Sequence, residues 1–175
     1  WATVKGIDYL DGAIMATPDF IGGVETQILY SGARDRYEKY EAVFAALGGK
    51  SAFVGEDFGV ASALDGALLA QLWGTLFGTL QATTIARAEG IALDDYAASL
   101  KLFRPVIDGA EVDLLSRVRD GRDRGDEATL ATIAAHNTAF QHLRHIVAER
   151  GLNPAITGAF DSYFAAAIAN GHGND

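Results

Sequence analysis

One carboxylate interrupts a long uncharged stretch of this sequence and is the first candidate for chemistry. Between Asp57 and Arg87, Asp65 is the only ionisable side chain. Placing a carboxylate among apolar side chains costs on the order of several kcal/mol unless it is paired, hydrated or used. Asp65 therefore either caps a helix or pairs with an arginine across the core, or it lines a cleft. In a cleft, its anion could bind a substrate cation, or its protonated form could donate a proton.

The residues that follow Asp65 suggest what such a cleft would bind. Leu69, Trp73 and Phe77 come at steps of four and share one slowly drifting face of a helix with Asp65. An acid beside an aliphatic and two aromatic side chains suits a small hydrophobic amine-like substrate. Core packing is the alternative for Leu69 and Phe77.

The stretch 58–86 that carries these residues is expected to be a helix roughly 40 Å long. It is apolar nearly all round, so something must bury it. Small residues recur along it at every fourth position and would let a second helix approach closely: Gly66, Ala70, Gly74, Gly78, Ala82 and Ala86. The length would also suit a membrane span. Ser62, Asp65, Gln71 and Gln81, four threonines and the acidic remainder favour a protein that does not enter a membrane.

Composition excludes several classes of function. The chain has 175 residues, 49% of them hydrophobic, with a formal net charge of −9. This length and composition indicate a globular protein, and the charge argues against a nucleic-acid partner. No cysteine is present, which excludes disulfides and thiolate catalysis and is consistent with the cytoplasm. The chain begins at Trp1 without a signal-peptide pattern, and we expect it to be a segment of a longer protein.

The pattern of elements changes after residue 55. Strands are expected at 7–15, 26–31 and 51–55, with a helix at 34–47. The rest is expected to be helical. After the helix at 58–86, further helices are expected at 93–103, 105–121, 128–150 and 154–170, and Pro105 is expected to end the first of these. The charged residues at 119–127 are expected to form a solvated connection. The sequence thus predicts a mainly α fold, with a small α/β domain at 1–55 and a helical domain at 56–175.

Other chemistry finds little support in these residues. No GxGxxG or Walker loop is present. Three histidines on one expected helix are possible metal ligands: His136, His142 and His145. No carboxylate lies in register with them to complete a ligand set, so we predict no metal site and interpret them as rim or interface residues. The carboxylates at 94–95 and 123–127 are interpreted as solvated charge.

Three segments resemble the NADPH-dependent imine reductases, which are relatives of the β-hydroxyacid dehydrogenases. They are DYLDGAIMATPDFIG (8–22), ILYSG (28–32) and FVGEDFGVASALDGALLAQLW (53–73), and the likeness extends over nearly the whole chain. The resemblance implies a Rossmann domain that binds NADPH, a long interdomain helix, and an all-helical domain exchanged between two subunits of a homodimer. Each active site would lie in the dimer cleft. Residues 1–55 would be the back part of the nucleotide-binding domain, and residues 56–175 the dimerisation domain.

The resemblance also implies roles for single residues. Asp65 would be catalytic, protonating or orienting the nitrogen of a cyclic or hydrophobic imine while NADPH delivers hydride to the carbon. Ala16 and Thr17 would face the cofactor. The substrate-binding residues would be Trp73, Leu69, Met15, Phe140 and Gln141, the last two reaching into the partner's cleft.

The sequence departs from the family in one respect. The glycine-rich turn that holds the cofactor's pyrophosphate is absent, so these 175 residues alone are expected to bind NADPH weakly. The dehydrogenase relatives carry a lysine early in the long helix, and none occurs here between Lys50 and Lys101, which disfavours hydroxyacid oxidation. A β-hydroxyacid dehydrogenase relative and a helical dimerisation module without catalysis are the alternatives.

Overall fold

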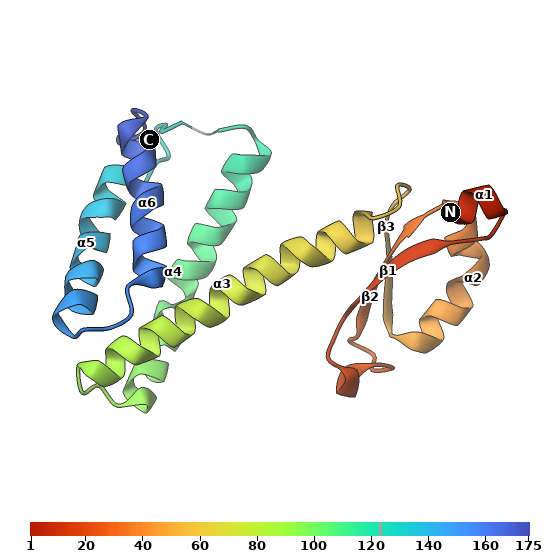
Figure 1. The fold of residues 1–175 in the computed structure, drawn as a ribbon, viewed down its shortest axis with the longest axis horizontal. Helices are drawn as coiled ribbons and strands as arrows, with labels where there is room; N and C mark the ends of the chain where they lie inside the picture. Colours follow the sequence, from red (N-terminus) through yellow and green to blue (C-terminus); the bar gives the residue numbers. More distant parts are fainter. Residues whose placement is uncertain (123) are drawn as a thin grey trace. The chain divides into compact units, whose positions relative to one another are not determined.

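A computed structural model describes residues 1–122 and 124–175, without the side chain of Thr3. The chain is mainly helical with one small sheet, as the sequence predicts, and it divides into two compact units (Figure 1). We call Trp1–Leu76 the first unit and Phe77–Asp175 the second unit. The division falls inside helix α3 (Val60–Ala88). The domain boundary expected between residues 55 and 56 stays a prediction.

The first unit holds a three-stranded sheet in the order β1-β2-β3. Strand β1 (Leu10–Met15) runs antiparallel to β2 (Gln27–Gly32), and β3 (Lys50–Gly55) runs parallel to β2. Helix α2 (Arg34–Leu47) makes the crossover that a parallel pair requires. The short helix α1 (Ala2–Lys5) and the 3₁₀ helix η1 (Pro18–Phe20) flank β1 and were not expected.

Strand β2 is the centre of this sheet and is covered on both faces. Its residues from Ile28 to Gly32 are all buried. On one face the strand packs against α2, where the rings of Tyr30 and Phe44 stack with centroids 4.2 Å apart. On the other face it joins a small core with the first turn of α3, made of Ala13, Leu29 and Ala61. The sheet therefore lies between α2 and the beginning of α3.

The second unit consists of the end of α3 and three further helices: α4 (Leu93–Arg119), α5 (Ile133–Glu149) and α6 (Ala155–Ala169). Helices α5 and α6 lie side by side (Figure 1). Val147 of α5 and Thr157 of α6 are both buried. Helix α4 has no buried residue among those that the structure describes.

The expectation that Pro105 ends a helix is wrong. Helix α4 runs without interruption from Leu93 through Pro105 to Arg119. A proline removes one hydrogen bond to the carbonyl four residues earlier, here that of Lys101. This carbonyl belongs to an exposed residue, so water can replace the missing donor. The ion pair between Arg104 Nε and Asp108 Oδ1, at 2.8 Å, also spans this turn.

The expected start of the helix at residue 128 is also wrong, because α5 begins at Ile133. Thr132 is its N-cap, and the Thr132 hydroxyl accepts a hydrogen bond from the backbone N–H of Ala135 at 3.2 Å. The residues before it form a turn around Asp126, whose carboxylate accepts a hydrogen bond from the N–H of Ala128 at 2.9 Å. Asp123, in the charged connection, lies outside the described residues.

An ion pair connects the end of α3 to the end of α5. Arg150 donates two parallel hydrogen bonds to Glu89, from Nε to Oε1 at 2.7 Å and from Nη2 to Oε2 at 2.8 Å. This bidentate arrangement is the strong form of an arginine–carboxylate pair. The hydrogen bond from Arg150 holds the pKa of Glu89 below its usual value.

The substitution Glu89→Gln should lower stability in a pH-dependent way. A carboxylate with a lowered folded-state pKa stabilises the fold above its unfolded pKa of about 4.3, and this contribution disappears as the pH falls through the folded-state pKa. We expect the variant to unfold at lower urea concentration than the parent at pH 7, and the two midpoints to converge as the pH falls through the folded-state pKa of Glu89. Glu38→Gln, at an exposed site on α2, is the control, and its urea midpoint should equal that of the parent at both neutral and acidic pH. A midpoint difference for Glu89→Gln that persists in acid would contradict this role of the charge.

Candidate active site

The first turn of α3 rests on the sheet and determines where Asp65 lies. Gly59 precedes the helix with φ at 91°, in the region that glycine adopts most readily. Ala61 is completely buried against the sheet. Asp65 follows Ala61 by four residues and therefore lies one turn further along the same face. The sequence shows that Asp65 lies on this helix. The contact between Ala61 and the sheet shows that the helix face that carries Asp65 is the face that turns toward the sheet at the first turn.

Asp65 has no structural partner among residues 1–122 and 124–175. Its side chain is half-buried. In the described part of the chain, no hydrogen bond or ion pair joins its carboxylate to another residue. The two structural alternatives, a helix cap and an arginine pair, are therefore not seen within one chain. The role of Asp65 in a reaction stays a prediction.

Leu69 and Trp73 continue the face of Asp65 along α3. Their side chains are 38% and 54% exposed. Side chains of this size seldom stay in water when they gather on one helix face. The three residues form an open wall within the first unit, which holds one acid and two large apolar groups.

Met15, expected at the substrate, is the last residue of β1, and Ala16 and Thr17, expected at the cofactor, follow directly after it. Met15 packs against the core of Ala13, Leu29 and Ala61, on the side of the sheet from which α3 starts. Thr17 is the N-cap residue of η1 but makes no side-chain cap hydrogen bond, and its hydroxyl donates a hydrogen bond to Asp19 Oδ1 at 2.6 Å. That bond lowers the pKa of Asp19. Ala16, between them, is half-buried.

Phe140 and Gln141 belong to α5, in the second unit. The ring of Phe140 packs against Phe164 of α6 at a centroid distance of 5.3 Å. Gln141 takes part in a polar network between the two helices, because Asp161 Oδ1 accepts a hydrogen bond from Gln141 Nε2 at 3.1 Å and forms an ion pair with Arg144 Nη1 at 2.9 Å. Both side chains thus have contacts between α5 and α6, and their role toward a substrate stays a prediction.

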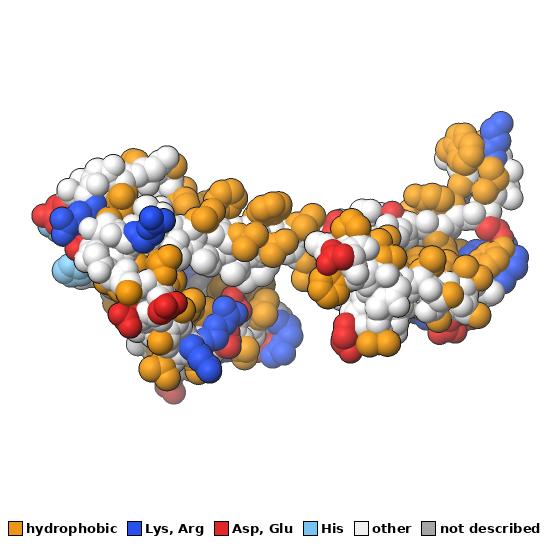
Figure 2. Space-filling view, turned by 90° about the horizontal axis from the view of Figure 1, so that it is seen from below, with side chains coloured by type: hydrophobic (Ala, Val, Ile, Leu, Met, Phe, Trp, Pro, Cys, Tyr) orange, Lys and Arg blue, Asp and Glu red, His pale blue; other side chains and the backbone are white. Residues whose placement is uncertain are grey.

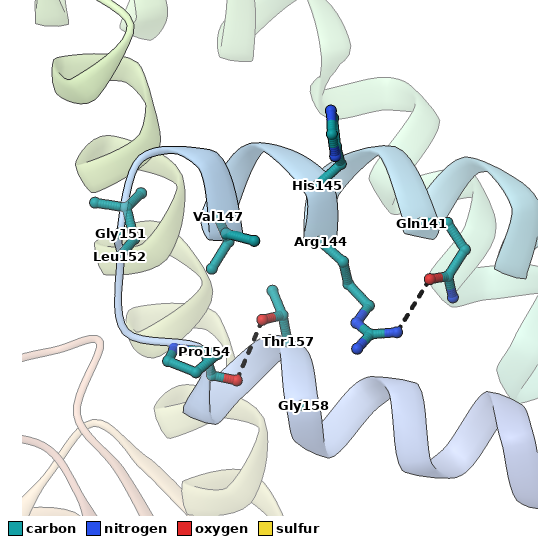
Figure 3. Close-up of a pocket in the computed structure, with 10 residues that line it drawn as sticks. Gln141, Arg144, His145, Val147, Gly151, Leu152, Pro154, Thr157 and Gly158 are labelled. Atoms are coloured by element: carbon teal, nitrogen blue, oxygen red, sulfur yellow. Dashed lines mark hydrogen bonds between the residues drawn. The ribbon is translucent and has the colours of Figure 1, made fainter.

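A cavity of about 560 Å³ opens between α5 and α6 beside Gln141 (Figure 3). Figure 3 shows Arg144 pointing from α5 toward α6, with its guanidinium donating to Gln141 Oε1 at 3.1 Å. A second hollow, of about 580 Å³, is lined only by apolar and aromatic side chains, including Phe140, Phe160 and Tyr163. Asp161 and Arg144 were not expected at either site, since a pair 17 positions apart on two helices leaves no local pattern.

The described residues contain no group of three His, Cys, Asp or Glu side chains placed to hold a metal ion. His145, one of the three histidines considered as ligands, lies 3.2 Å from Glu149 on the same exposed helix face.

Comparison with known proteins identifies the family. A family model described as "NADPH-dependent reductive aminase-like, C-terminal domain" matches residues 57–175. The chain belongs to this family. The resemblance to the imine reductases is thereby confirmed.

Relatives of this reductive aminase-like chain are similar over its whole length. The NADPH-dependent reductive aminase of Aspergillus oryzae is 27% identical over 177 residues, which is 100% of this chain and 59% of the relative. An imine reductase from Myxococcus stipitatus, the V8 variant in complex with NAD⁺, is 54% identical and superposes with a TM-score of 0.97. The match covers 100% of this chain and 61% of the chain of that imine reductase. A reductive aminase from Aspergillus terreus, in complex with NADPH and ethyl levulinate, is 30% identical with a TM-score of 0.84, covering 99% and 60%. The chain thus spans about three-fifths of the length of these relatives.

The substitution Asp65→Asn should leave the stability of the reductive aminase-like chain nearly unchanged. No described residue loses a hydrogen bond or ion pair, so we expect the free energy of unfolding to change by less than about 0.5 kcal/mol. Urea unfolding at one protein concentration measures it. The comparison variant is Leu29→Ala in the core, where Leu29 is 1% exposed, and there a loss of about 2–5 kcal/mol is expected. A loss for Asp65→Asn that approaches the loss for Leu29→Ala would show that Asp65 is structural.

Proposed function

We propose that this chain forms the helical half and the adjoining sheet of an NADPH-dependent imine-reducing enzyme, with Asp65 in the active site. The observation that carries the proposal is the half-buried carboxylate of Asp65, which has no partner in the described chain and stands on a helix that belongs to the reductive aminase-like family. Relatives in complex with NADP⁺ or NADPH support the choice of cofactor.

NADPH, when bound, supplies a hydride to the imine carbon. The imine nitrogen then needs a proton, so that the C=N bond becomes a CH–NH bond and NADPH becomes NADP⁺. Asp65 either donates this proton or stabilises a substrate that is already an iminium cation. Met15, Ala16 and Thr17 are proposed to lie on the nicotinamide side. The turn that holds the pyrophosphate is not among these 175 residues, so a chain that includes this segment is needed for activity.

The wall beside Asp65 supports a small hydrophobic imine as the substrate class. Leu69 and Trp73 offer apolar surface on the same helix face, and an aromatic ring also stabilises a nearby cation. Phe140 and Gln141, on α5, are proposed to complete the pocket from the partner subunit. The complex of the Aspergillus terreus relative holds ethyl levulinate, a ketone, and a ketone forms an imine when it condenses with an amine.

The exposed apolar surface of α3 and α4 supports a homodimer with exchanged helical domains. Large hydrophobic side chains of α3 and α4 are more than a third exposed, among them Leu72, Leu76, Leu102, Leu115 and Val118. Figure 2 shows hydrophobic side chains on the surface of both units. A β carbon added at Gly66, Gly74 or Gly78 would meet no atom within 4 Å. The small residues of α3 therefore offer open space, and we propose that a helix of a second copy of the chain packs closely there.

By length and composition alone α3 could also cross a membrane, and it is the one such helix in the described residues. The same criterion is met by core helices, so it is weak evidence. Ser62, Asp65 and the threonine hydroxyls along α3, together with the family, favour a protein partner over lipid.

Asp65→Ala tests the proposed function directly. In a chain that carries the cofactor-binding segment, we expect the kcat for imine reduction to fall by about 10²–10⁴, the range for the loss of a general acid or base. Steady-state turnover of a cyclic imine with NADPH measures it, and analytical ultracentrifugation should show an unchanged dimer. Turnover equal to that of the parent would refute the role. Turnover of a hydroxyacid with NADP⁺ would instead support a dehydrogenase, and no turnover by the parent would support the module without catalysis.

Gly74→Leu tests the proposed dimer. The added side chain would keep the helices of the two subunits apart, although it meets no other atom within one chain. We therefore expect the variant dimer to dissociate at a higher protein concentration than the parent dimer, without loss of the helical circular-dichroism signal. Gly74→Ala keeps a small residue at the same site and should behave like the parent. A monomeric parent, or a dimer of Gly74→Leu as stable as the parent, would contradict the proposed packing.

A further inference from the structure

The beginning of α3 is held by two side chains that come from the sheet. A helix leaves its first four backbone N–H groups without partners inside the helix. Here the N–H groups of Val60 and Ala63 use nearby backbone carbonyls, those of Asp57 at 3.4 Å and Gly59 at 2.8 Å. The other two use distant side chains. The Ala61 N–H donates to Ser31 Oγ at 3.0 Å, and the Ser62 N–H donates to Asp11 Oδ2 at 3.1 Å.

Asp11 holds Ser62 by more than one bond. The Ser62 hydroxyl donates to Asp11 Oδ1 at 3.0 Å and to Oδ2 at 2.9 Å. An ionised carboxylate at this position also interacts favourably with the positive end of the helix dipole. Asp11 therefore fixes both the backbone and the side chain of one residue in the first turn.

The sheet brings the two anchoring residues together. Asp11 of β1 and Ser31 of β2 are direct partners in the antiparallel register, so their side chains lie next to each other on one face. The β2–β3 pairing is irregular between Tyr30 and Ser31. Such irregularities redirect a side chain locally. Ser31 is completely buried.

The next residue of β2 makes the close approach possible. Gly32 has φ at 129°, and a β carbon there would lie 2.8 Å from Cε1 of Phe58, just before α3. A larger residue would have a strained backbone here and would displace the Phe58 ring from the sheet. Asp11, Ser31 and Gly32 thus define one rigid junction between the sheet and the helix.

This junction determines the position of Asp65. Asp65 follows Ala61 by four residues and Ser62 by three, which places it one helical turn beyond the two anchored N–H groups and on their side of the helix. Rotation or sliding of α3 at its first turn would move the Asp65 carboxylate directly. A displacement of about 1 Å at a reacting group is enough to change rates by about 10²-fold.

We propose that Asp11 and Ser31 are positioning residues for the reaction, which act through α3 by setting the rotation and height of Asp65. The proposal rests on the proposed function, since it requires Asp65 to take part in turnover. Neither side chain is required to touch the substrate or the cofactor. Both should matter for kcat more than for substrate affinity.

A double-mutant cycle tests the proposal in a chain that carries the cofactor-binding segment. We expect Asp11→Ala and Ser31→Ala each to lower the kcat for imine reduction by about tenfold or more, with little change in KM, in NADPH affinity or in the mass of the assembly. In the Asp65→Ala background the same two substitutions should have almost no further effect, because the group that they position is gone. Asp11→Asn keeps one acceptor oxygen and should restore part of the kcat.

Asn153→Ala is the matched control, because it removes a side-chain acceptor from the start of α6, a helix that carries neither Asp65 nor another proposed site residue: Asn153 Oδ1 accepts a hydrogen bond from the Ala155 N–H at 2.9 Å. It should leave kcat unchanged. Equal losses of kcat from Asp11→Ala in the parent and in the Asp65→Ala background would overturn the positioning role, as would full activity of both single variants. If Asp65→Ala itself keeps full activity, the proposed function fails, and this result is separate from the outcome for Asp11 and Ser31.

Discussion

The structure depends on how one long apolar helix is covered and oriented. Helix α3 holds 29 residues with a single ionisable side chain between its start and Arg87. Its first turn is fastened to the sheet, and its end is tied to α5 through Glu89 and Arg150. Between these two points most of its side chains face away from the rest of the described chain. A helix of this composition is stable in water only when something covers it.

The rest of the fold follows from that constraint. The sheet is small, but it buries β2 on both faces and so provides a firm base for the first turn of α3. Helix α4 is also long, has no buried residue in the described chain, and exposes large hydrophobic side chains such as Leu102 and Leu115. The exposed apolar side chains of these two helices are the basis of the proposed homodimer.

The sequence predicted those elements whose signal is local. A short apolar run, residues 28–30, identifies β2, and the helical spacing of Tyr37 and Phe44 identifies α2. Predictions failed where a long-range or solvent effect outweighs a local preference. Pro105 does not end α4, because the carbonyl that it leaves unpaired belongs to the exposed residue Lys101 and an adjacent ion pair spans the turn. Helix α5 begins after residue 128, because Thr132 and Asp126 offer better partners to the backbone than further helix would.

For the site, the sequence by itself determined that Asp65 stands alone on an apolar helix and that Leu69 and Trp73 share its face, because helical periodicity is a property of neighbouring residues. It could not show that Asp11 and Ser31 hold that helix. Their bonds to Ser62 and Ala61 span 51 and 30 positions, and they exist only because the β1–β2 register places both side chains on the face where α3 begins. Nor could it show that Asp65 has no partner in the described chain, since pairing depends on which groups the fold brings within hydrogen-bond distance.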